Sequence, residues 1–326
     1  MSLTSRFHYY RRISRAYLFP GTSQLTFWHE KPEVNPQAGI RQLGEYYMLF
    51  AEKADYAGPL DGSGIPLLDY HGRIGRQYNP IAIAQWGLGN YNRFHRSGCD
   101  EQRAKFFAAS DWLGARLEKN RSGLAVWNHH FDWEYRVPLK APWYSGLAQG
   151  LGISLLVRAH QVTSESLYLE VADRAFASFL KSTNEGGVSF TDSRGNVWLE
   201  EYIVWPPTHI LNGFIWMAWG IYDYFLATQS LVARDLFNAA VETLRTNLHR
   251  YDLGFWSRYE QSGTALPMIA SPFYHRLHTV QLRVMHRITG HSEFLQFAEK
   301  WETYSRSFSK RTRALCCKSV FKLCYY

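Results

Sequence analysis

The sequence predicts a mainly α-helical protein, an (α/α) toroid of about four helix pairs with β-hairpins between the pairs and a β-rich N-terminal extension. Three observations lead to this fold class. A proline followed by an apolar, aromatic-rich helical segment recurs along the chain, and an amphipathic helical segment follows each one. After most pairs, Gly precedes a short run of β-branched and aromatic residues. An internal repeat of this length is typical of stacked helix pairs.

The first helix of each pair is marked by Pro80, Pro142, Pro206 and Pro272, which recur every 62 to 66 residues. Proline suits the first turn of a helix because its missing N–H would be unpaired there. The segments that follow are rich in Gly, Ala and aromatic residues on all sides, and a helix that is apolar all round is a buried one. We therefore expect these segments to form the inner helices of the toroid.

The second helix of each pair is amphipathic. Apolar residues recur there at intervals of three or four, which is the helical period: Leu169, Ala172, Phe176 and Phe179; Leu236, Ala240, Leu244 and Leu248; Phe294, Phe297, Trp301 and Tyr304. We expect these helices on the outside, in a barrel domain that spans residues 79–305.

Short extended stretches should lie between the helix pairs. Gly123, Gly186 and Gly254 each precede one, and glycine suits the left-handed end of a helix. The second stretch predicts a hairpin, with strands over 188–191 and 197–202 joined by a turn at 192–195. Loops gathered at one end of a scaffold are the usual place for a binding or catalytic site.

The two ends of the chain differ from the repeat. Residues 1–78 read as a β-rich N-terminal extension, with strands over 25–28 and 46–50 and a loop-rich arm over 55–75. Residues 306–326 form a basic, cysteine-containing C-terminal tail. Disorder is the default expectation for a terminus; packing on the barrel or mediating a homodimer are the alternatives.

The charge points to an anionic partner. Lys and Arg number 36 against 28 Asp and Glu, which gives a net charge of +8, and 16% of the residues are aromatic. A basic surface attracts acidic polymers, and aromatic rings stack on sugar faces. No nucleic-acid-binding motif, metal-ligand spacing, signal peptide or membrane-spanning stretch is apparent. We expect a cytoplasmic protein with no metal and no cofactor.

Carboxylates, tyrosines and histidines are the remaining candidates for chemistry, because no phosphate loop, nucleophile elbow or zinc-protease motif is present. Glu200, Glu201 and Tyr202 end the predicted hairpin, and neighbouring side chains of a strand face opposite ways. Tyr274 and His278 would share a helix face. The alternative is an exposed acidic strand end beside core aromatic and histidine side chains.

Residues from about 78 to 305 resemble the D-glucuronyl C5-epimerase family, which acts on heparosan and heparan sulfate precursors. The resemblance lies in several ordered stretches: 78–88, 143–150, 153–159, 200–202, 211–214, 251–252 with Tyr259, 274–278 and 281–282. It weakens over 203–207 and 261–271, and the N-terminal region is shorter than in animal members. These departures leave the tolerance of sulfated substrates open.

The resemblance implies that Glu201, Tyr202, Tyr259 and Tyr274 are the catalytic residues, that no cofactor is needed, and that the partner is a heparosan-like anionic polysaccharide. The family's α-helical toroid agrees with the repeat. The substrate-binding residues expected from the matching stretches are Tyr78, Gln85, Tyr144, Gln149, Asn212, His275, Arg276 and His278.

Epimerisation at C5 of a uronate needs acid/base groups on opposite faces of the ring. We assign these roles to Glu201 and Tyr274, with Tyr202 and Tyr259 neutralising the substrate carboxylate. A tyrosine base requires cationic neighbours to lower its pKa from about 10, and Arg258, Arg276 and His275 are the candidates.

Three alternatives remain at this point: a polysaccharide lyase, a glycoside hydrolase that would pair Glu201 with Asp132 or Glu134, and a non-catalytic binding protein for acidic glycans.

Overall fold

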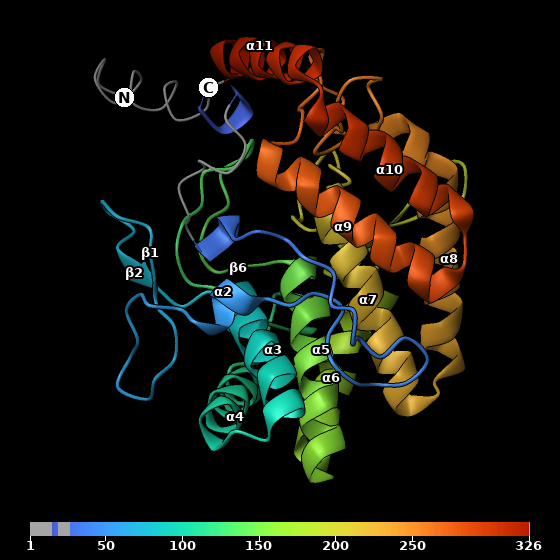
Figure 1. The fold of residues 1–326 in the computed structure, drawn as a ribbon. Coiled ribbons are helices and arrows are strands. Elements are labelled where there is room, and N and C mark those ends of the chain that lie inside the picture. Colours follow the sequence, from blue (N-terminus) through green and yellow to red (C-terminus); the bar gives the residue numbers. More distant parts are fainter. Residues whose placement is uncertain (1–14, 19–26, 326) are drawn as a thin grey trace. The chain divides into compact units, whose positions relative to one another are not determined.

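The computed structural model describes residues 15–18 and 27–325 (Figure 1). Within them the chain forms two compact units. Of the described residues, unit 1 comprises 15–18, 27–34, 210–212 and 245–325, and unit 2 comprises 35–209 and 213–244. Neither predicted domain boundary, at residue 78 or at residue 305, coincides with a boundary between these units.

Unit 2 carries most of the helix pairs. The pairs are α3 (Pro80–Ser97) with α4 (Asp100–Ala115), α5 (Gly146–Thr163) with α6 (Ser166–Phe176), and α7 (Leu211–Thr228) with α8 (Leu231–Asn247). Helix α3 packs on α4 and α5 packs on α6, while the rings of Tyr222 on α7 and Phe237 on α8 lie 4.6 Å apart. The predicted pattern of paired helices is therefore confirmed.

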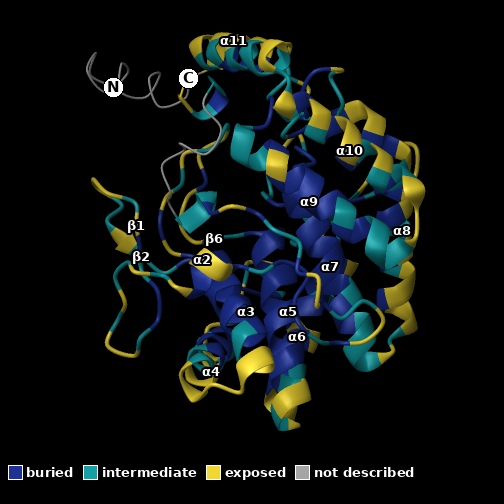
Figure 2. Ribbon diagram, viewed as in Figure 1, coloured by how far each residue is buried: buried dark blue, intermediate teal, exposed yellow. Residues whose placement is uncertain are grey.

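The first helix of each pair is buried, as its composition predicts. All residues are buried over 80–92 of α3 and 146–159 of α5, whereas α4 and α8 alternate between buried and exposed positions (Figure 2). Helices α5 and α7 approach closely at Gly150 and Gly220, because a Cβ on Gly220 would overlap the Gly150 backbone. Glycine at both positions makes this tight contact sterically allowed.

Two of the four prolines do not open a helix. Pro80 is the first residue of α3, behind an Asn79 side chain that accepts the N–H of Ile81 at 2.9 Å. Pro142 instead precedes the short strand β6 (Trp143–Tyr144), and α5 begins at Gly146. Pro206 likewise stands five residues before α7. The predicted helix starts after Pro142 and Pro206 are therefore wrong by several residues.

The strands are short and lie between the helices. They form four antiparallel pairs: β1 (Leu68–Asp69) with β2 (Arg76–Gln77), β3 (Glu118–Lys119) with β4 (Ala125–Val126), β5 (Asn128–His129) with β6, and β7 (Ser189–Thr191) with β8 (Val197–Leu199). The hairpin predicted around 192–195 is confirmed. The stretch after Gly254 forms only isolated bridges, between Asp252 and Ser257 and between Arg258 and Ile269.

Residues 35–50 of unit 2 form an irregular segment that the helices hold through side chains. Asn92 of α3 accepts the N–H of Tyr46 at 2.6 Å and donates to the carbonyl of Met48 at 2.8 Å. Arg158 of α5 donates to the Gly44 carbonyl at 2.9 Å. The strand predicted over 46–50 is wrong, because helix side chains satisfy this backbone in place of a neighbouring strand.

Unit 1 contains α9 (Pro272–Thr289), α10 (Ser292–Arg306) and α11 (Phe308–Tyr325). Helix α9 packs on α10 as the fourth predicted pair, and α10 packs on α11. Disorder, the default expectation for the C-terminal tail, is wrong, since Ala314, Lys318 and Phe321 of α11 are buried. A short 3₁₀ helix, η1 (Phe27–His29), replaces the strand predicted over 25–28; residues 25 and 26 lie outside the described residues.

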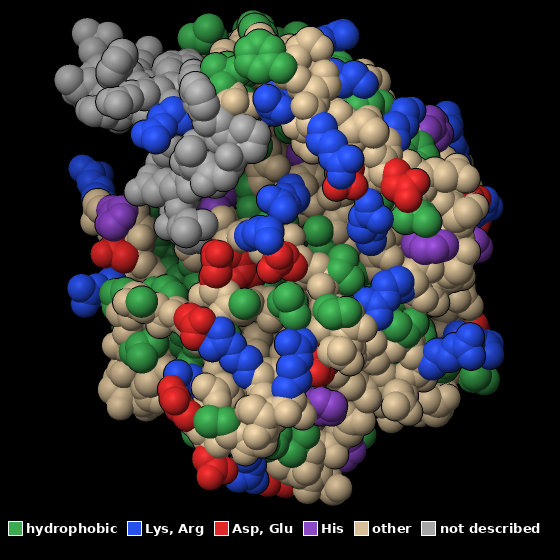
Figure 3. All heavy atoms as spheres, viewed as in Figure 1, with side chains coloured by type: hydrophobic (Ala, Val, Ile, Leu, Met, Phe, Trp, Pro, Cys, Tyr) green, Lys and Arg blue, Asp and Glu red, His purple; other side chains and the backbone are tan. Residues whose placement is uncertain are grey.

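None of the helices in the described ranges combines the length and the apolar character that crossing a membrane requires. On the face shown in Figure 3, Lys and Arg side chains are scattered, with Asp and Glu side chains among them. Ion pairs between such side chains include Lys105 with Glu101 on α4 and Arg283 with Glu302 in unit 1. The positive net charge therefore does not gather into a single basic area on this face.

Candidate active site

Glu200, directly after β8, is engaged inside unit 2. One carboxylate oxygen accepts the backbone N–H groups of Thr208 at 3.2 Å and His209 at 3.1 Å, and the other lies 2.5 Å from His209 Nδ1. The residue is only 1% exposed. Glu200 therefore holds the backbone at residues 208 and 209 in place. No local sequence pattern indicates its partner His209.

Glu201 faces the start of α7. A methyl group on Gly213, the third residue of that helix, would overlap the Glu201 carboxylate, so the two are in close contact. The Glu201 carbonyl accepts the N–H of Gly146, the first residue of α5, at 3.1 Å. The first turn of a helix stabilises negative charge through its unpaired N–H groups and dipole. The Glu201 carboxylate therefore lies beside the first turn of α7, in space that a side chain at position 213 would occupy.

Tyr202 is half-buried and packs against aromatic side chains of unit 2. Its ring centroid lies 4.5 Å from that of Tyr135 and 5.8 Å from that of Trp143. An isolated antiparallel bridge joins its backbone to Ser145, the residue that caps α5. The ring is thereby oriented by the same segment that positions Glu201.

Tyr259 and Tyr274 form a second pair, in unit 1. Their ring centroids are 4.9 Å apart in an edge-to-face arrangement, a geometry that aromatic rings favour. The Tyr259 N–H donates to the Met268 carbonyl at 2.8 Å, and the Tyr274 N–H donates to the capping hydroxyl of Ser271 at 3.3 Å. The His29 ring also lies 6.4 Å from that of Tyr274, a neighbour that the sequence pattern did not indicate.

Tyr78, expected at the substrate, lines a small pocket of about 60 Å³ in unit 2 together with Trp112, Arg116 and His130. Its hydroxyl donates to the Asp61 carboxylate at 2.6 Å. This hydrogen bond to Asp61, together with partial burial, raises the pKa of Tyr78. The phenol therefore stays protonated and can act as a hydrogen-bond donor or a stacking surface.

The other expected binding residues of unit 2 are largely engaged with the protein. Gln149 is fully buried. Its side-chain oxygen accepts the backbone N–H of Trp127 at 3.0 Å, and its side-chain nitrogen donates to the Ser178 hydroxyl at 3.2 Å. The Tyr144 hydroxyl donates to the Gly186 carbonyl at 2.7 Å. Gln85 is 2% exposed. Gln149 and Tyr144 thus already bond to other residues of unit 2.

The expected binding residues of unit 1 fall into two groups. Arg276 is exposed, whereas Asn212 is 2% exposed and both His275 and His278 are completely buried. Burial lowers the pKa of His275 to about 3, so the imidazole is neutral at physiological pH. The expectation that His275 serves as a cationic neighbour of a tyrosine is therefore wrong.

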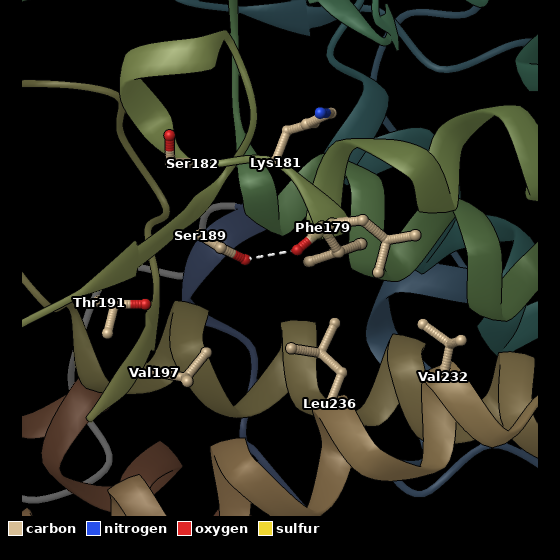
Figure 4. A pocket seen from close by; sticks show the side chains of 9 residues that line it. Phe179, Lys181, Ser182, Ser189, Thr191, Val197, Val232 and Leu236 are labelled. Carbon is tan, nitrogen blue, oxygen red and sulfur yellow. Dashed lines mark hydrogen bonds between the residues drawn. The ribbon is translucent and has the colours of Figure 1, made fainter. Parts of the chain in front are cut away.

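A larger groove, of about 370 Å³, opens on unit 2 (Figure 4). Lining residues include Phe179 from the 3₁₀ helix η2 (Ala177–Leu180), Ser189 of β7, and Val232 and Leu236 of α8. The Ser189 hydroxyl donates to the Phe179 carbonyl at 2.6 Å. No residue expected in the catalytic or substrate-binding set lines this groove. Within 15–18 and 27–325, no group of three or more His, Cys, Asp or Glu could hold a metal ion.

The fold and the residues just described define a mainly helical protein of the (α/α)-toroid class that carries a buried carboxylate beside one tyrosine and a separate tyrosine pair. Residues 121–303 match the family model described as D-glucuronyl C5-epimerase C-terminus. The match covers more than half of the chain and includes Glu201, Tyr202, Tyr259 and Tyr274. The chain therefore belongs to this family, and the resemblance inferred from the sequence is confirmed.

Known relatives agree with this assignment. The chain is 30% identical over 223 residues to the D-glucuronyl C5-epimerase of Caenorhabditis elegans, covering 64% of this chain and 36% of that protein. It is 27% identical over 190 residues to an uncharacterized protein of Methanocaldococcus jannaschii, covering 57% of this chain and 60% of the relative. The chain thus spans less than two thirds of the length of either relative.

Among solved structures, cellobiose 2-epimerase from Spirochaeta thermophila matches with a TM-score of 0.52 at 11% identity, covering 92% of this chain and 85% of that one. At this level of identity the likeness shows a shared fold, and it confirms the predicted fold class.

Proposed function

We propose that this chain is a carbohydrate epimerase that inverts C5 of D-glucuronate units in a heparosan-like polysaccharide, giving L-iduronate. The observation that carries the proposal is the family match over residues 121–303, which includes the buried Glu201 beside Tyr202 and the Tyr259–Tyr274 pair. The proposal uses no cofactor, because the chemistry is proton transfer alone.

The reaction breaks the C5–H bond and forms it again on the opposite face of the ring. A base removes the C5 proton, and the electron pair of that bond moves into the adjacent carboxylate to give an enolate-like intermediate. Hydrogen-bond donors must stabilise this additional negative charge. An acid on the other face then returns a proton to C5, and no other bond is broken.

We assign the two proton transfers to Glu201 and Tyr274, with Tyr202 and Tyr259 donating hydrogen bonds to the substrate carboxylate. The contact of the Glu201 carboxylate with the Gly213 position fixes where that side chain lies, which supports a role in proton transfer. Both tyrosine rings of the second pair are oriented by packing. Tyr78 lines a pocket and Arg276 is exposed, and we assign both side chains to binding the polysaccharide.

Incubation with heparosan in deuterated water tests the proposal. Proton NMR should show iduronate signals and deuterium at C5, and Tyr274→Phe should reduce C5 exchange by at least 100-fold, in line with the loss of a general acid/base. A lyase would instead release an unsaturated uronate that absorbs in the near ultraviolet. Binding without any C5 exchange would mark a non-catalytic glycan-binding protein, and either result would overturn the proposal.

A further inference from the structure

Ser257 and two histidines of α9 form a fully buried hydrogen-bonded cluster in unit 1. The Ser257 hydroxyl lies 2.8 Å from His275 Nδ1 and 3.0 Å from His278 Nδ1. The Ser257 backbone N–H lies 3.2 Å from the same His275 Nδ1. All three residues are 0% exposed, so they cannot touch a polysaccharide in this conformation.

The direction of each hydrogen bond follows from what its partners can do. A backbone N–H only donates, so His275 Nδ1 accepts, and His275 Nε2 must donate to the Trp301 carbonyl, 2.9 Å away. The Ser257 hydroxyl, at 2.8 Å, donates to the same nitrogen and shares its single lone pair with the backbone N–H. His278 Nδ1 is left to donate to the Ser257 oxygen. The chain of donors therefore runs from His278 through Ser257 and His275 to Trp301.

Both imidazoles are neutral in this arrangement. Burial lowers the pKa of His275 to about 3 and lowers that of His278 well below its usual value. The hydrogen-bond directions therefore persist throughout the neutral pH range. Moving either chain segment would break the buried hydrogen bond between Ser257 and His275, which is costly because the freed polar atoms cannot reach water.

This cluster joins the two segments that carry the tyrosines of unit 1. Ser257 precedes Tyr259 by two residues, and the bridges at Ser257 and Arg258 hold the backbone that leads into Tyr259. His275 follows Tyr274 at the start of α9. The Trp256 ring also stacks on His275, with centroids 3.8 Å apart. The hydrogen bond between Ser257 and His275 thus fixes the position of Tyr259 relative to Tyr274.

We propose that Ser257 and His275 are positioning residues, which hold Tyr259 against Tyr274 in the geometry needed for proton transfer at C5. This inference rests on the proposed epimerase function and gives His275 a different role from direct substrate binding. A displacement of about 1 Å in a reacting group can cost roughly 100-fold in rate. The effect of losing the contact should therefore appear in kcat and leave KM unchanged.

Ser257→Ala is the first test, with Thr279→Val as the matched control. Thr279 lies on α9, and its buried hydroxyl donates only to the carbonyl of Arg276 in the same helical turn. With heparosan in deuterated water, Ser257→Ala should lower kcat by 10- to 100-fold, keep KM within twofold, and change the ratio of C5 exchange to inversion. Thr279→Val should retain the wild-type ratio. Partial unfolding would reduce exchange and inversion equally.

A pair of substitutions at His275 separates the two ring nitrogens. In His275→Asn the amide lies where Nδ1 was and can still accept from Ser257, whereas in His275→Gln it lies where Nε2 was and can bond only to Trp301. His275→Asn should retain at least tenfold more kcat than His275→Gln. This comparison remains decisive if Ser257→Ala does not fold.

The outcomes separate this inference from the proposed function. An active wild-type enzyme in which Ser257→Ala behaves as Thr279→Val, or in which Asn and Gln at position 275 are equivalent, would overturn the positioning role alone. A rise in KM in both His275 variants would indicate substrate binding instead. Absence of C5 exchange in the wild type would overturn the proposed function itself.

Discussion

Two neighbouring glutamates have different environments because successive side chains of an extended segment face opposite directions. Glu200 accepts hydrogen bonds from the Thr208 and His209 backbone and binds the His209 ring. Glu201 instead rests against Gly213, where no side chain separates the carboxylate from α7. Residue type alone does not distinguish the two, whereas their contacts do.

Gly213→Ala should separate activity from stability. The added methyl group would overlap the Glu201 carboxylate and Cβ and so displace that side chain. Alanine also favours the helix by about 1 kcal/mol over glycine, which offsets part of the steric cost. We expect C5 exchange to fall at least tenfold while the urea unfolding midpoint changes little.

The matched control is Gly114→Ala on α4, because nothing lies within 4 Å of a Cβ added there. It should gain the same helix preference without loss of activity. Equal activities of the two variants would contradict the assigned role of the Glu201 position.

Much of the candidate site could be predicted from the sequence at this scale, since Glu201, Tyr202, Tyr259 and Tyr274 lie in stretches that match the family. The residues that hold these four side chains in place could not be predicted. His209, Ser257 and His29 act through contacts that depend on how separate segments pack. Periodicity indicates which face of α9 carries His278 but not that the face is sealed from solvent.

At the scale of single elements, α11 contributes more than its sequence suggests. The segment is basic and lacks a clear amphipathic pattern, yet Lys318 is buried and donates to the Ile269 carbonyl at 2.9 Å. Arg313 lies over the Phe255 ring at 4.2 Å. Ile269 in turn forms a bridge with Arg258, the neighbour of Tyr259. Helix α11 therefore supports the backbone that carries Tyr259.

Lys318 should make the stability of the protein depend on alkaline pH. Burial lowers its pKa from 10.5 to about 8. Between these values the unfolded chain binds a proton that the folded chain does not, so stability rises with pH. Relative to Lys318→Met, the wild type should gain about 2 kcal/mol between pH 7.5 and pH 9.5.

Urea unfolding of both proteins at these two pH values measures the difference, since groups common to both cancel. Parallel pH profiles for the wild type and Lys318→Met would show that Lys318 remains charged in the folded state.

The helix pairs were predictable because apolar residues recur with the 3.6-residue helical period in their second helices, whereas their first helices are apolar on all sides. The first residues of the helices were harder to predict. Proline fits the first turn of α3 and α9, but Pro142 and Pro206 fit equally well in the segments that precede α5 and α7. The segment 35–50 escaped prediction because side chains of distant helices hold its backbone, and no local pattern encodes such partners.

At the scale of the whole chain, a completely buried ion pair links separate elements of unit 2. Arg158 of α5 donates to both carboxylate oxygens of Asp223 on α7, at 2.7 and 3.1 Å, and both residues are 0% exposed. The Tyr47 hydroxyl donates to the same carboxylate at 2.7 Å. Two inner helices and the 35–50 segment thus meet at a single charge pair.

Asp223→Asn should destabilise unit 2 by about 3–5 kcal/mol, because it leaves the Arg158 charge buried without an anion. Urea denaturation followed by circular dichroism measures this loss. The control is Glu293→Gln, which removes a partly exposed ion pair with Arg245 and should shift the unfolding midpoint far less. A loss of equal size in both variants would contradict the central role of the buried pair.

The brevity of the strands has a consequence for behaviour at high concentration. Each named strand of the described chain has two or three residues and already pairs with one neighbour. Intermolecular β-pairing and fibril growth require long, flat edges with free N–H and C=O groups. A protein that spaces its helices with such short hairpins offers few templates of this kind and should resist amyloid-type aggregation while it remains folded.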